Sequence, residues 1–198
     1  DERSRRRFIA QARVSARLRH ENIIDIRDLV EEQGEVYLIF DLHQGPTLGE
    51  IIASRGGLPY PQARGWIEQV AAALDYAHRS GVLHGDLKPS NVLIDPGGRA
   101  RVRDFAIGPA MEEVISPTGS KTSAGVGTPA YMAPEQERGA PRNESDVFAL
   151  GVCLYEALTG RKPFAGTGSG LLRGKLERDF TPVSSLVGGL PANLDRTL

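Results

Sequence analysis

The sequence predicts an α+β fold that is mostly helical after residue 42. Two segments rich in β-branched and apolar residues, 23–30 and 35–42, lie near the start, and the residues Gln33 and Gly34 between them are typical of a hairpin turn. Two longer segments, 61–79 and 146–159, repeat apolar residues every three or four positions, as helices with a buried face do. The chain therefore combines an early strand pair with a larger helical part.

The first 60 residues predict two further helices. Residues 5–19 place apolar or small residues at helical spacing, namely Phe8, Ala12, Ser15 and Leu18. The arginines at positions 3, 5, 6 and 7 are interpreted as a solvated helix face rather than a nucleic-acid contact, because the whole chain carries a net charge of −1. The run from Thr47 to Glu50 has the form of a capping box and predicts a short helix to about Ser54.

The remaining elements follow in order along the chain. Gly81 is expected to end the helix over 61–79, and short strands are expected at 82–83, 92–94 and 99–103, with a turn at 95–98. Residues 106–130 lose periodicity and form a loop long enough to be functional. The helix over 146–159 has little polar surface and should be buried up to Gly160, and a short helix follows at about 169–177.

Composition excludes several classes of protein. With 198 residues, 40% hydrophobic and 25% charged, the chain has the composition of an ordinary globular protein, and its charge gives no drive toward nucleic acid or an anionic membrane. A single cysteine, Cys153, rules out an internal disulfide and favours a reducing compartment. No apolar run has the length of a membrane span. We expect a cytoplasmic location, and because the chain begins with Asp1 we expect a piece of a longer protein that carries any membrane anchor elsewhere.

One polar loop carries a combination of residues suited to phosphoryl transfer. Asp86, Lys88 and Asn91 lie within six residues, and Asp104 follows 18 residues after Asp86. Phosphoryl transfer needs a base for the incoming hydroxyl, a cation for the moving phosphate and oxygen ligands for Mg²⁺, and this set supplies all of them. Each residue alone would be read as an ordinary surface residue, but their order and spacing together favour chemistry.

The same residues resemble the catalytic loop and metal-binding segment of eukaryotic-type protein kinases, especially bacterial serine/threonine kinases. Segments 127–135 and 146–151 resemble the end of a kinase activation segment and the buried central helix. The resemblance covers nearly the whole chain and implies a protein-kinase-like fold truncated at both ends. It implies a partial smaller lobe over residues 1–42, with one helix, two strands and the start of the hinge, and the larger lobe over 43–198, which stops before its last helices.

The resemblance implies roles for the residues of the polar loop. Asp86 would accept or orient the hydroxyl proton and Lys88 would neutralise the γ-phosphoryl group. Asn91 and Asp104 would hold Mg²⁺. Thr128 would hydrogen-bond near Asp86 and Lys88. The implied reaction is transfer of the γ-phosphoryl group of ATP to serine or threonine hydroxyls of a protein substrate.

The resemblance also implies a nucleotide site. Phe40 would be the gatekeeper, the backbone of Asp41 and His43 would contact adenine, and Leu93 would pack beneath the ring. Other implied contacts are structural: the rings of His84 and Phe105 would stack, and the carboxylate of Asp146 would accept backbone N–H groups of the catalytic loop.

Several positions depart from the family pattern. No glycine-rich phosphate loop or strand lysine precedes the first helix, and the glycines at 166–170 lie in a loop with the wrong spacing. Gln11 replaces a glutamate, Gly85 an arginine and Ala106 a glycine. In the family that arginine receives the activation-loop phosphate, so Ser120 and Thr122, which match the phosphorylated positions of bacterial relatives, would lack their local cation. The arginine partner of Glu135 should lie beyond Leu198.

These departures predict at most trace activity for the 198 residues alone. They also predict that the apolar side chains of Phe8 and Leu18 are left exposed, since part of the sheet that such residues pack against is missing.

Two alternative functions stay open at the level of sequence. Aminoglycoside and choline phosphotransferases share the His-Gly-Asp-Leu run and accommodate Gly85, but Lys88 and the segments around Thr128 and Asp146 are foreign to them. A pseudokinase that serves as a binding or scaffold module is favoured by Gln11, by Ala106 and by the missing lysine. The intact set of polar loop residues opposes it.

Overall fold

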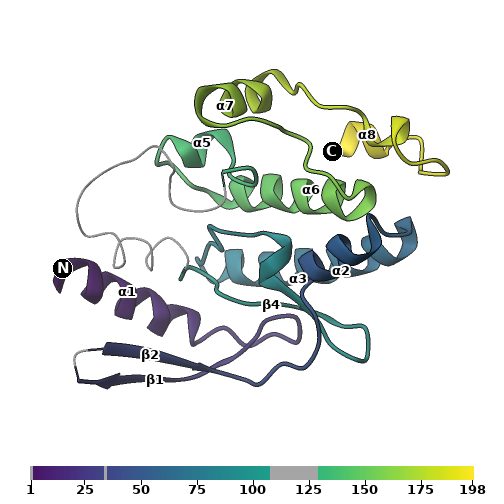
Figure 1. Ribbon diagram of the computed structural model, residues 1–198. Helices are drawn as coiled ribbons and strands as arrows, with labels where there is room; N and C mark the ends of the chain where they lie inside the picture. The colour runs from purple at the N-terminus through teal and green to yellow at the C-terminus, as the bar shows by residue number, and fades with distance from the viewer. Residues whose placement is uncertain (1, 34, 108–128) are drawn as a thin grey trace.

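The computed structural model describes residues 2–33, 35–107 and 129–198. Its smaller part contains helix α1 (Glu2–Ser15) and the strands β1 (Ile26–Glu32) and β2 (Glu35–Phe40). The two strands pair antiparallel with Leu29 opposite Leu38, and the register shifts between Ile26 and Asp28. Helix α1 lies along one face of this strand pair (Figure 1).

The inner face of the strand pair forms a small apolar core with α1. Phe8 and Ile9 pack against Ile26 and Ile107. The expectation that Phe8 and Leu18 would be exposed is wrong, because Phe8 is only 7% exposed in this core and Leu18 joins the main core of the larger part. Exposed apolar side chains do occur on the outer face of β2, at Tyr37 and Ile39, and on α1 at Val14.

The larger part is built around two long helices, α3 (Tyr60–Arg79) and α6 (Asn143–Thr159), which lie side by side in the middle of the molecule (Figure 1). The other elements of this part are α2 (Leu48–Arg55), η1 (Pro89–Asn91), β3 (Val92–Ile94), β4 (Ala100–Val102), α5 (Pro134–Glu137), α7 (Gly168–Glu177), η2 (Val183–Ser185) and α8 (Leu194–Thr197). Strands β3 and β4 form an antiparallel hairpin that packs against α3. The arrangement confirms the predicted α+β fold with a mostly helical larger part.

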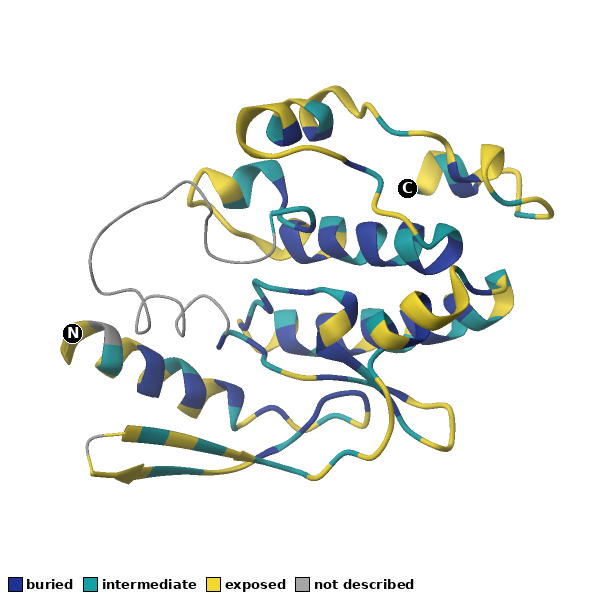
Figure 2. Cartoon of the chain, viewed as in Figure 1, coloured by how far each residue is buried: buried dark blue, intermediate teal, exposed yellow. Residues whose placement is uncertain are grey.

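The facing sides of α3 and α6 supply much of the main core (Figure 2). Val70 and Leu74 of α3 and Leu158 of α6 are almost fully buried, because apolar residues recur there with the period of the helix. The first turn of α6 differs from the prediction. Val147 is 57% exposed although this helix was expected to be buried, whereas Asp146, whose carboxylate was expected to face the catalytic loop, is buried.

The start of α2 and the end of α6 follow the predicted capping signals, whereas α1 ends at Ser15 rather than at residue 19 and α6 begins at Asn143 rather than at residue 146. The Thr47 side chain accepts from the Glu50 backbone N–H and the Glu50 carboxylate accepts from the Thr47 backbone N–H, which confirms the capping box of α2. Gly160 ends α6 at φ 69°, in the left-handed region that glycine adopts without strain. A Cβ atom at Gly160 would lie 2.3 Å from the carbonyl oxygen of Gly56, so the ends of α2 and α6 meet through their backbones.

Two predictions about local structure are modified, and a third falls mostly outside the described residues. Residues 82–83 form no strand, because the Val82 N–H donates to the carbonyl of Ala77 and so belongs to the turn that closes α3. The short helix predicted at about 169–177 is confirmed as α7, and because α7 begins at Gly168 the glycines of 166–170 do not form a loop throughout. The predicted loop over 106–130 lies mostly outside the described residues.

A short extended segment after α1 joins the smaller part to the larger one. The Ile24 N–H donates to the carbonyl of Val102, and the Val102 N–H donates to the carbonyl of Asn22.

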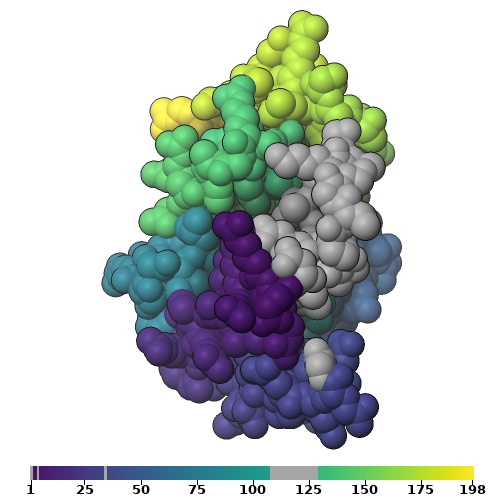
Figure 3. Space-filling view, turned by 90° about the vertical axis from the view of Figure 1, so that its left-hand side faces the viewer, coloured from purple at the N-terminus to yellow at the C-terminus, as the bar shows by residue number. Residues whose placement is uncertain are grey.

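Figure 3 shows the whole molecule from a second side, with β1 and β2 at one end and α7 at the other. In the described part of the chain, no helix combines the length and the apolar character needed to cross a bilayer.

Candidate active site

The loop between α3 and β3 brings three of the predicted site residues into direct contact. The Lys88 ammonium lies 2.6 Å from Oδ2 of Asp86, and Nδ2 of Asn91 donates to the backbone carbonyl of Asp86 at 2.9 Å. The side chains of Asp86 and Lys88 are 14% and 24% exposed, so both are held by the protein and still reach solvent. The two side chains can therefore contact a substrate while their mutual ion pair keeps them in place.

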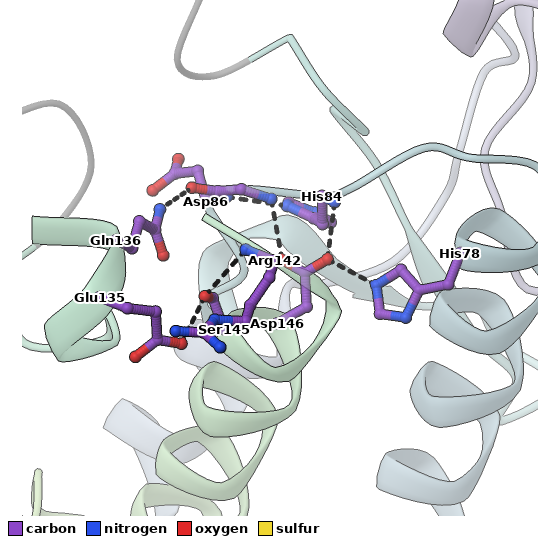
Figure 4. A network of polar contacts seen from close by, with 9 residues as sticks. His78, His84, Asp86, Glu135, Gln136, Arg142, Ser145 and Asp146 are labelled. Atoms are coloured by element: carbon purple, nitrogen blue, oxygen red, sulfur yellow. Dashed lines mark hydrogen bonds and ion pairs between the residues drawn. The ribbon is translucent and has the colours of Figure 1, made fainter. Parts of the chain in front are cut away.

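The backbone of this loop is fixed by Asp146 at the start of α6 (Figure 4). Its carboxylate accepts the backbone N–H groups of His84 at 2.8 Å and Gly85 at 2.9 Å, which confirms the predicted role. Nε2 of His78 also lies 2.7 Å from Oδ2 of Asp146. Gly85 has φ 78°, a conformation that costs glycine little and a side chain more. Glycine therefore suits this turn locally, where the family pattern has an arginine.

His84 connects the loop to the segment that carries Asp104. Its Nδ1 accepts the backbone N–H of Asp86 and its Nε2 lies 3.0 Å from the carbonyl of Arg103, so the ring is the neutral Nε2–H tautomer. Burial lowers the pKa of His84 below its usual value, although the carboxylates of Asp146, Asp86 and Asp104 act in the opposite direction. The ring centroid lies 4.9 Å from that of Phe105 with the planes tilted by 55°, which confirms the predicted contact but not parallel stacking. His84 is structural, as expected.

Asn91 and Asp104 flank the same end of the β3–β4 hairpin. Val92 pairs with Val102, and the Arg103 N–H donates to the Asn91 carbonyl at 3.0 Å, so Asn91 immediately precedes one strand and Asp104 follows the other by two residues. Asp104 has φ 65°, which turns the chain sharply after the strand. Arg103 Nε lies 3.1 Å from Oδ2 of Asp104.

Ala106 also has positive φ, at 57°. This angle is unfavourable for a residue with a Cβ atom, and it is the position where the family pattern has glycine. The Ala106 N–H donates to the His84 carbonyl at 3.2 Å, and the Ser15 hydroxyl donates to the Phe105 carbonyl at 2.5 Å. Contacts from both parts of the molecule thus hold this segment in the strained conformation.

The donor set suits a magnesium ion. Asn91 uses its amide nitrogen to bind the loop, so its carbonyl oxygen is the atom available as a ligand beside the Asp104 carboxylate. Amide and carboxylate oxygens are the hard ligands that Mg²⁺ prefers, and Mg²⁺ commonly binds through one or two protein oxygens together with phosphates and water. Among the described residues, no group of three or more His, Cys, Asp or Glu side chains is arranged to hold a metal ion, so a purely protein-ligated site of that kind is not seen there.

The predicted nucleotide-site residues lie along a second segment. Phe40 ends β2, and the Asp41 N–H donates to the Asp25 carbonyl. Hydrogen bonds from Arg27 lower the pKa of the Asp41 carboxyl. His43 is half-buried, and its Nε2 has no hydrogen-bond partner among the described residues.

Leu93 is joined to this segment by backbone pairing. Leu93 forms an antiparallel bridge with Thr47, and the Ile94 N–H donates to the Pro46 carbonyl at 2.9 Å. The chain that follows His43 therefore runs beside β3. Among the described residues, no hydrogen bond or ion pair joins Phe40, Asp41 or His43 to the polar loop.

The end of the predicted activation segment packs against the polar loop. Gln136 Nε2 donates to the Gly85 carbonyl at 2.5 Å, and the Glu135 carboxylate accepts the Ser145 hydroxyl at 2.6 Å (Figure 4). The Ser145 contact occupies an oxygen of Glu135, for which an arginine beyond the chain had been expected. Thr128, Ser120 and Thr122 lie outside the described residues.

Sequence reasoning missed several residues of this network, among them His78 and Gln136. His78 gave a signal that was available, since it stands in the last turn of a helix six residues before His84. Gln136 gave none, because its partner Gly85 is 51 residues away and only the fold brings them together.

Comparison with known proteins identifies the class to which this site belongs. The family described as "Protein kinase domain" matches residues 1–181, and the chain belongs to that family. Among its relatives are three bacterial serine/threonine-protein kinases: PrkC of Bacillus subtilis, 40% identical over 162 residues, PknA of Mycobacterium tuberculosis, 38% identical over 194 residues, and PknL of Mycobacterium tuberculosis, 35% identical over 197 residues.

The matches cover most of this chain but a smaller share of the relatives. They include 81% of the chain and 24% of PrkC, 95% of the chain and 44% of PknA, and 98% of the chain and 49% of PknL. The similarity therefore concerns a bacterial serine/threonine protein kinase catalytic domain with a partial protein-kinase fold, and the chain spans no more than about half of these relatives.

Proposed function

We propose that this chain acts as part of a bacterial protein serine/threonine kinase, transferring the γ-phosphoryl group of ATP to serine or threonine hydroxyls of a protein. The observation that carries the proposal is the contact set of Asp86, Lys88 and Asn91 on a loop whose backbone is held by Asp146. Named relatives of the same family support the protein substrate class.

The geometry of the polar loop suits in-line transfer to a hydroxyl. Asp86 accepts the proton of the acceptor hydroxyl as the hydroxyl oxygen bonds to the γ-phosphorus and the bond to the ADP oxygen breaks. Lys88, which lies 2.6 Å from Asp86, neutralises negative charge on the phosphoryl oxygens and keeps the carboxylate in place. Asn91 and Asp104 would hold Mg²⁺, which would supply positive charge to offset that of the phosphates.

We assign the other predicted residues to binding. The carbonyl of Asp41 and the backbone of His43 contact adenine beside Phe40, and Leu93 packs against the ring from β3. Thr128 takes part in shaping the hydroxyl site. We also assign residues 1–42 to the smaller lobe and 43–198 to the larger lobe, with the segment from Asn22 to Ile24 as the connection that pairs with β4.

The test is phosphoryl transfer from radiolabelled ATP with Mg²⁺ to three kinds of acceptor: a mixture of serine- and threonine-containing proteins, an aminoglycoside and choline. We expect slow transfer to protein that falls by about 10²–10⁴-fold in the Asp86→Asn variant. Equal transfer by the wild-type chain and Asp86→Asn would refute the assignment of Asp86. Transfer to the small molecules alone would identify a small-molecule phosphotransferase.

The pseudokinase alternative is favoured by Gln11 and has its own outcome. Gln11 lies where the family pattern has a glutamate, and its buried Oε1 has no partner among the described residues. Binding of ATP without any transfer that depends on Asp86 would support a binding module. Isothermal titration of ATP in the presence and absence of Mg²⁺, run beside the transfer assay, separates the two functions.

A further inference from the structure

A buried lysine on α7 contacts the end of the activation segment. The side chain of Lys175 is 0% exposed. Its ammonium donates to the carbonyls of Pro129 and Met132, the latter at 2.8 Å, and lies 2.5 Å from Oε1 of Glu137. Lysine is rarely buried to this degree unless its charge is paired, and Glu137 supplies that pair.

The three contacts use the full donor capacity of the ammonium. Lysine has three N–H donors, and here each has one acceptor, two of them backbone carbonyls. An apolar residue at position 175 would fill the same space but leave these acceptors without their donors. Lys175 therefore does more than fill space. It fixes the positions of the backbone carbonyls of Pro129 and Met132, the first and last residues of the segment 129–132.

The segment held by Lys175 forms one wall of the site around Asp86. A small cavity beside the catalytic loop is lined by Asp86 and Leu87 on one side and by Tyr131, Met132 and Gln136 on the other. The wall is also tied to the loop by Gln136 and to α6 by the Tyr131 hydroxyl, which donates to Glu156 at 2.5 Å. Helix α5 accordingly lies between α6 and α7 (Figure 1).

We propose that Lys175 is a positioning residue for the protein acceptor, which holds the wall formed by residues 129–137 at the distance from Asp86 that a hydroxyl-bearing side chain requires. This inference rests on the proposed function, because the acceptor is taken to be a protein. Lys175 touches neither the acceptor nor ATP. Its effect passes through the carbonyls of Pro129 and Met132, so it should alter the use of the acceptor and leave the use of ATP unchanged.

The test compares Lys175→Met with a control on the same helix, Arg173→Met. Methionine has about the length and the apolar stem of lysine but no N–H donors. Arg173 is exposed, and its side chain forms an ion pair with Glu177 on the same helix. In the transfer assay we expect Lys175→Met to raise the KM for the protein acceptor about 10-fold or more with the KM for ATP unchanged, and Arg173→Met to change neither. Equal changes in both constants, or no change in either, would overturn the inference.

Amide hydrogen exchange gives a readout that does not depend on turnover. In Lys175→Met, the amides of residues 130–140 should exchange faster while those in the middle of α3 and α6 keep their protection. Unchanged exchange over 130–140 would overturn the inference. If Lys175→Met does not fold, Glu137→Gln replaces it, since that variant removes only the paired charge and should produce the same pattern more weakly.

The two readouts separate failure of this inference from failure of the proposed function. A wild-type chain that transfers no phosphate to protein, combined with faster exchange over 130–140 in Lys175→Met, would refute the kinase function and keep the role of Lys175 in holding the segment. Transfer that depends on Asp86, combined with unaltered exchange and an unaltered KM for the acceptor, would keep the kinase function and refute the role of Lys175.

Discussion

The catalytic loop and helix α1 satisfy their buried polar groups to different degrees. Around the loop, the N–H groups of His84 and Gly85 donate to Asp146, and both ring nitrogens of His84 are hydrogen-bonded. On α1, Oε1 of Gln11 and Nε of Arg5 are buried without a partner among the described residues. The loop is thus held by a connected polar network, whereas α1 is held mainly by apolar packing of residues such as Phe8 against the strand pair.

This difference shows which part of the site is held in place by polar contacts within the described chain. The residues that would act on the acceptor hydroxyl are fixed by contacts within the described chain. The side where ATP would enter rests on a two-stranded sheet and a helix on which buried atoms of Arg5 and Gln11 have no partner among the described residues, which costs stability that the network around the catalytic loop does not lose. Four measurements test this comparison, beginning with the largest expected effect.

Removal of the Asp146 carboxylate should have the largest effect. Asp146→Ala leaves the buried N–H groups of His84 and Gly85 without an acceptor, and we expect a loss of about 3–5 kcal/mol in the free energy of unfolding. Thermal unfolding should show a fall in Tm of roughly 10 °C. Glu144→Gln, in the exposed first turn of the same helix, is the matched control and should leave Tm nearly unchanged. A small effect of Asp146→Ala would mean that the network does not stabilise the larger part.

Truncation of Phe8 tests the apolar packing of the smaller part. Phe8→Ala opens a cavity between α1 and the strands, and we expect a loss of about 3 kcal/mol in urea unfolding. Ile39→Thr, on the exposed outer face of β2, should cost about 0.5 kcal/mol or less. Similar losses for both variants would contradict the view that only the inner face of the strand pair contributes.

The pH dependence of stability tests the burial of His84. Because burial lowers the pKa of His84 below the ordinary value of 6.5, the unfolded chain binds a proton there that the folded chain does not. The resulting loss of stability should begin as the pH falls through 6.5 and grow until the folded-state pKa is reached. Calorimetry at pH 7.5 and 5.5 should show a smaller fall in Tm for His84→Gln than for the wild-type chain, and equal falls would show that His84 does not titrate in this way.

Replacement of Gln11 should have the smallest effect and the opposite sign. Gln11→Met keeps the length of the side chain and removes the buried oxygen that has no partner, so we expect a gain of about 1 kcal/mol. This corresponds to a rise in Tm of about 2–4 °C. A loss of stability would show that the amide of Gln11 makes contacts that matter, and the contrast between α1 and the catalytic loop would then be smaller than the structure indicates.

Local signals in the sequence predicted much of the helical framework. Thr47 and Gly160 define helix ends through their own backbone chemistry, so the capping box of α2 and the left-handed end of α6 were accessible without a structure. The cluster of Asp86, Lys88 and Asn91 was predictable for the same reason, because its members are close in sequence and its loop is short.

Interactions between distant residues were not predictable in this way. Phe8 was expected to be exposed because its partners were thought to be missing, but Ile26 and Ile107 bury it. Lys175 was overlooked although it stands four residues after the buried Leu171, on the same face of α7. A lysine on an apolar face is a signal in itself, but its acceptors at Pro129 and Met132 are more than 40 residues away and only the folded chain reveals them.

The register of the β3–β4 hairpin determines which variants of this chain keep a usable metal site. Asn91 and Asp104 come to the same end only because Val92 pairs with Val102, and a shift of one residue in either strand would turn its side chains to the opposite face. An added residue in the turn at 95–99 can be absorbed there without changing the pairing. Natural or designed chains with this loop should therefore vary in the length of the turn, while an insertion within either three-residue strand should separate the amide from the carboxylate.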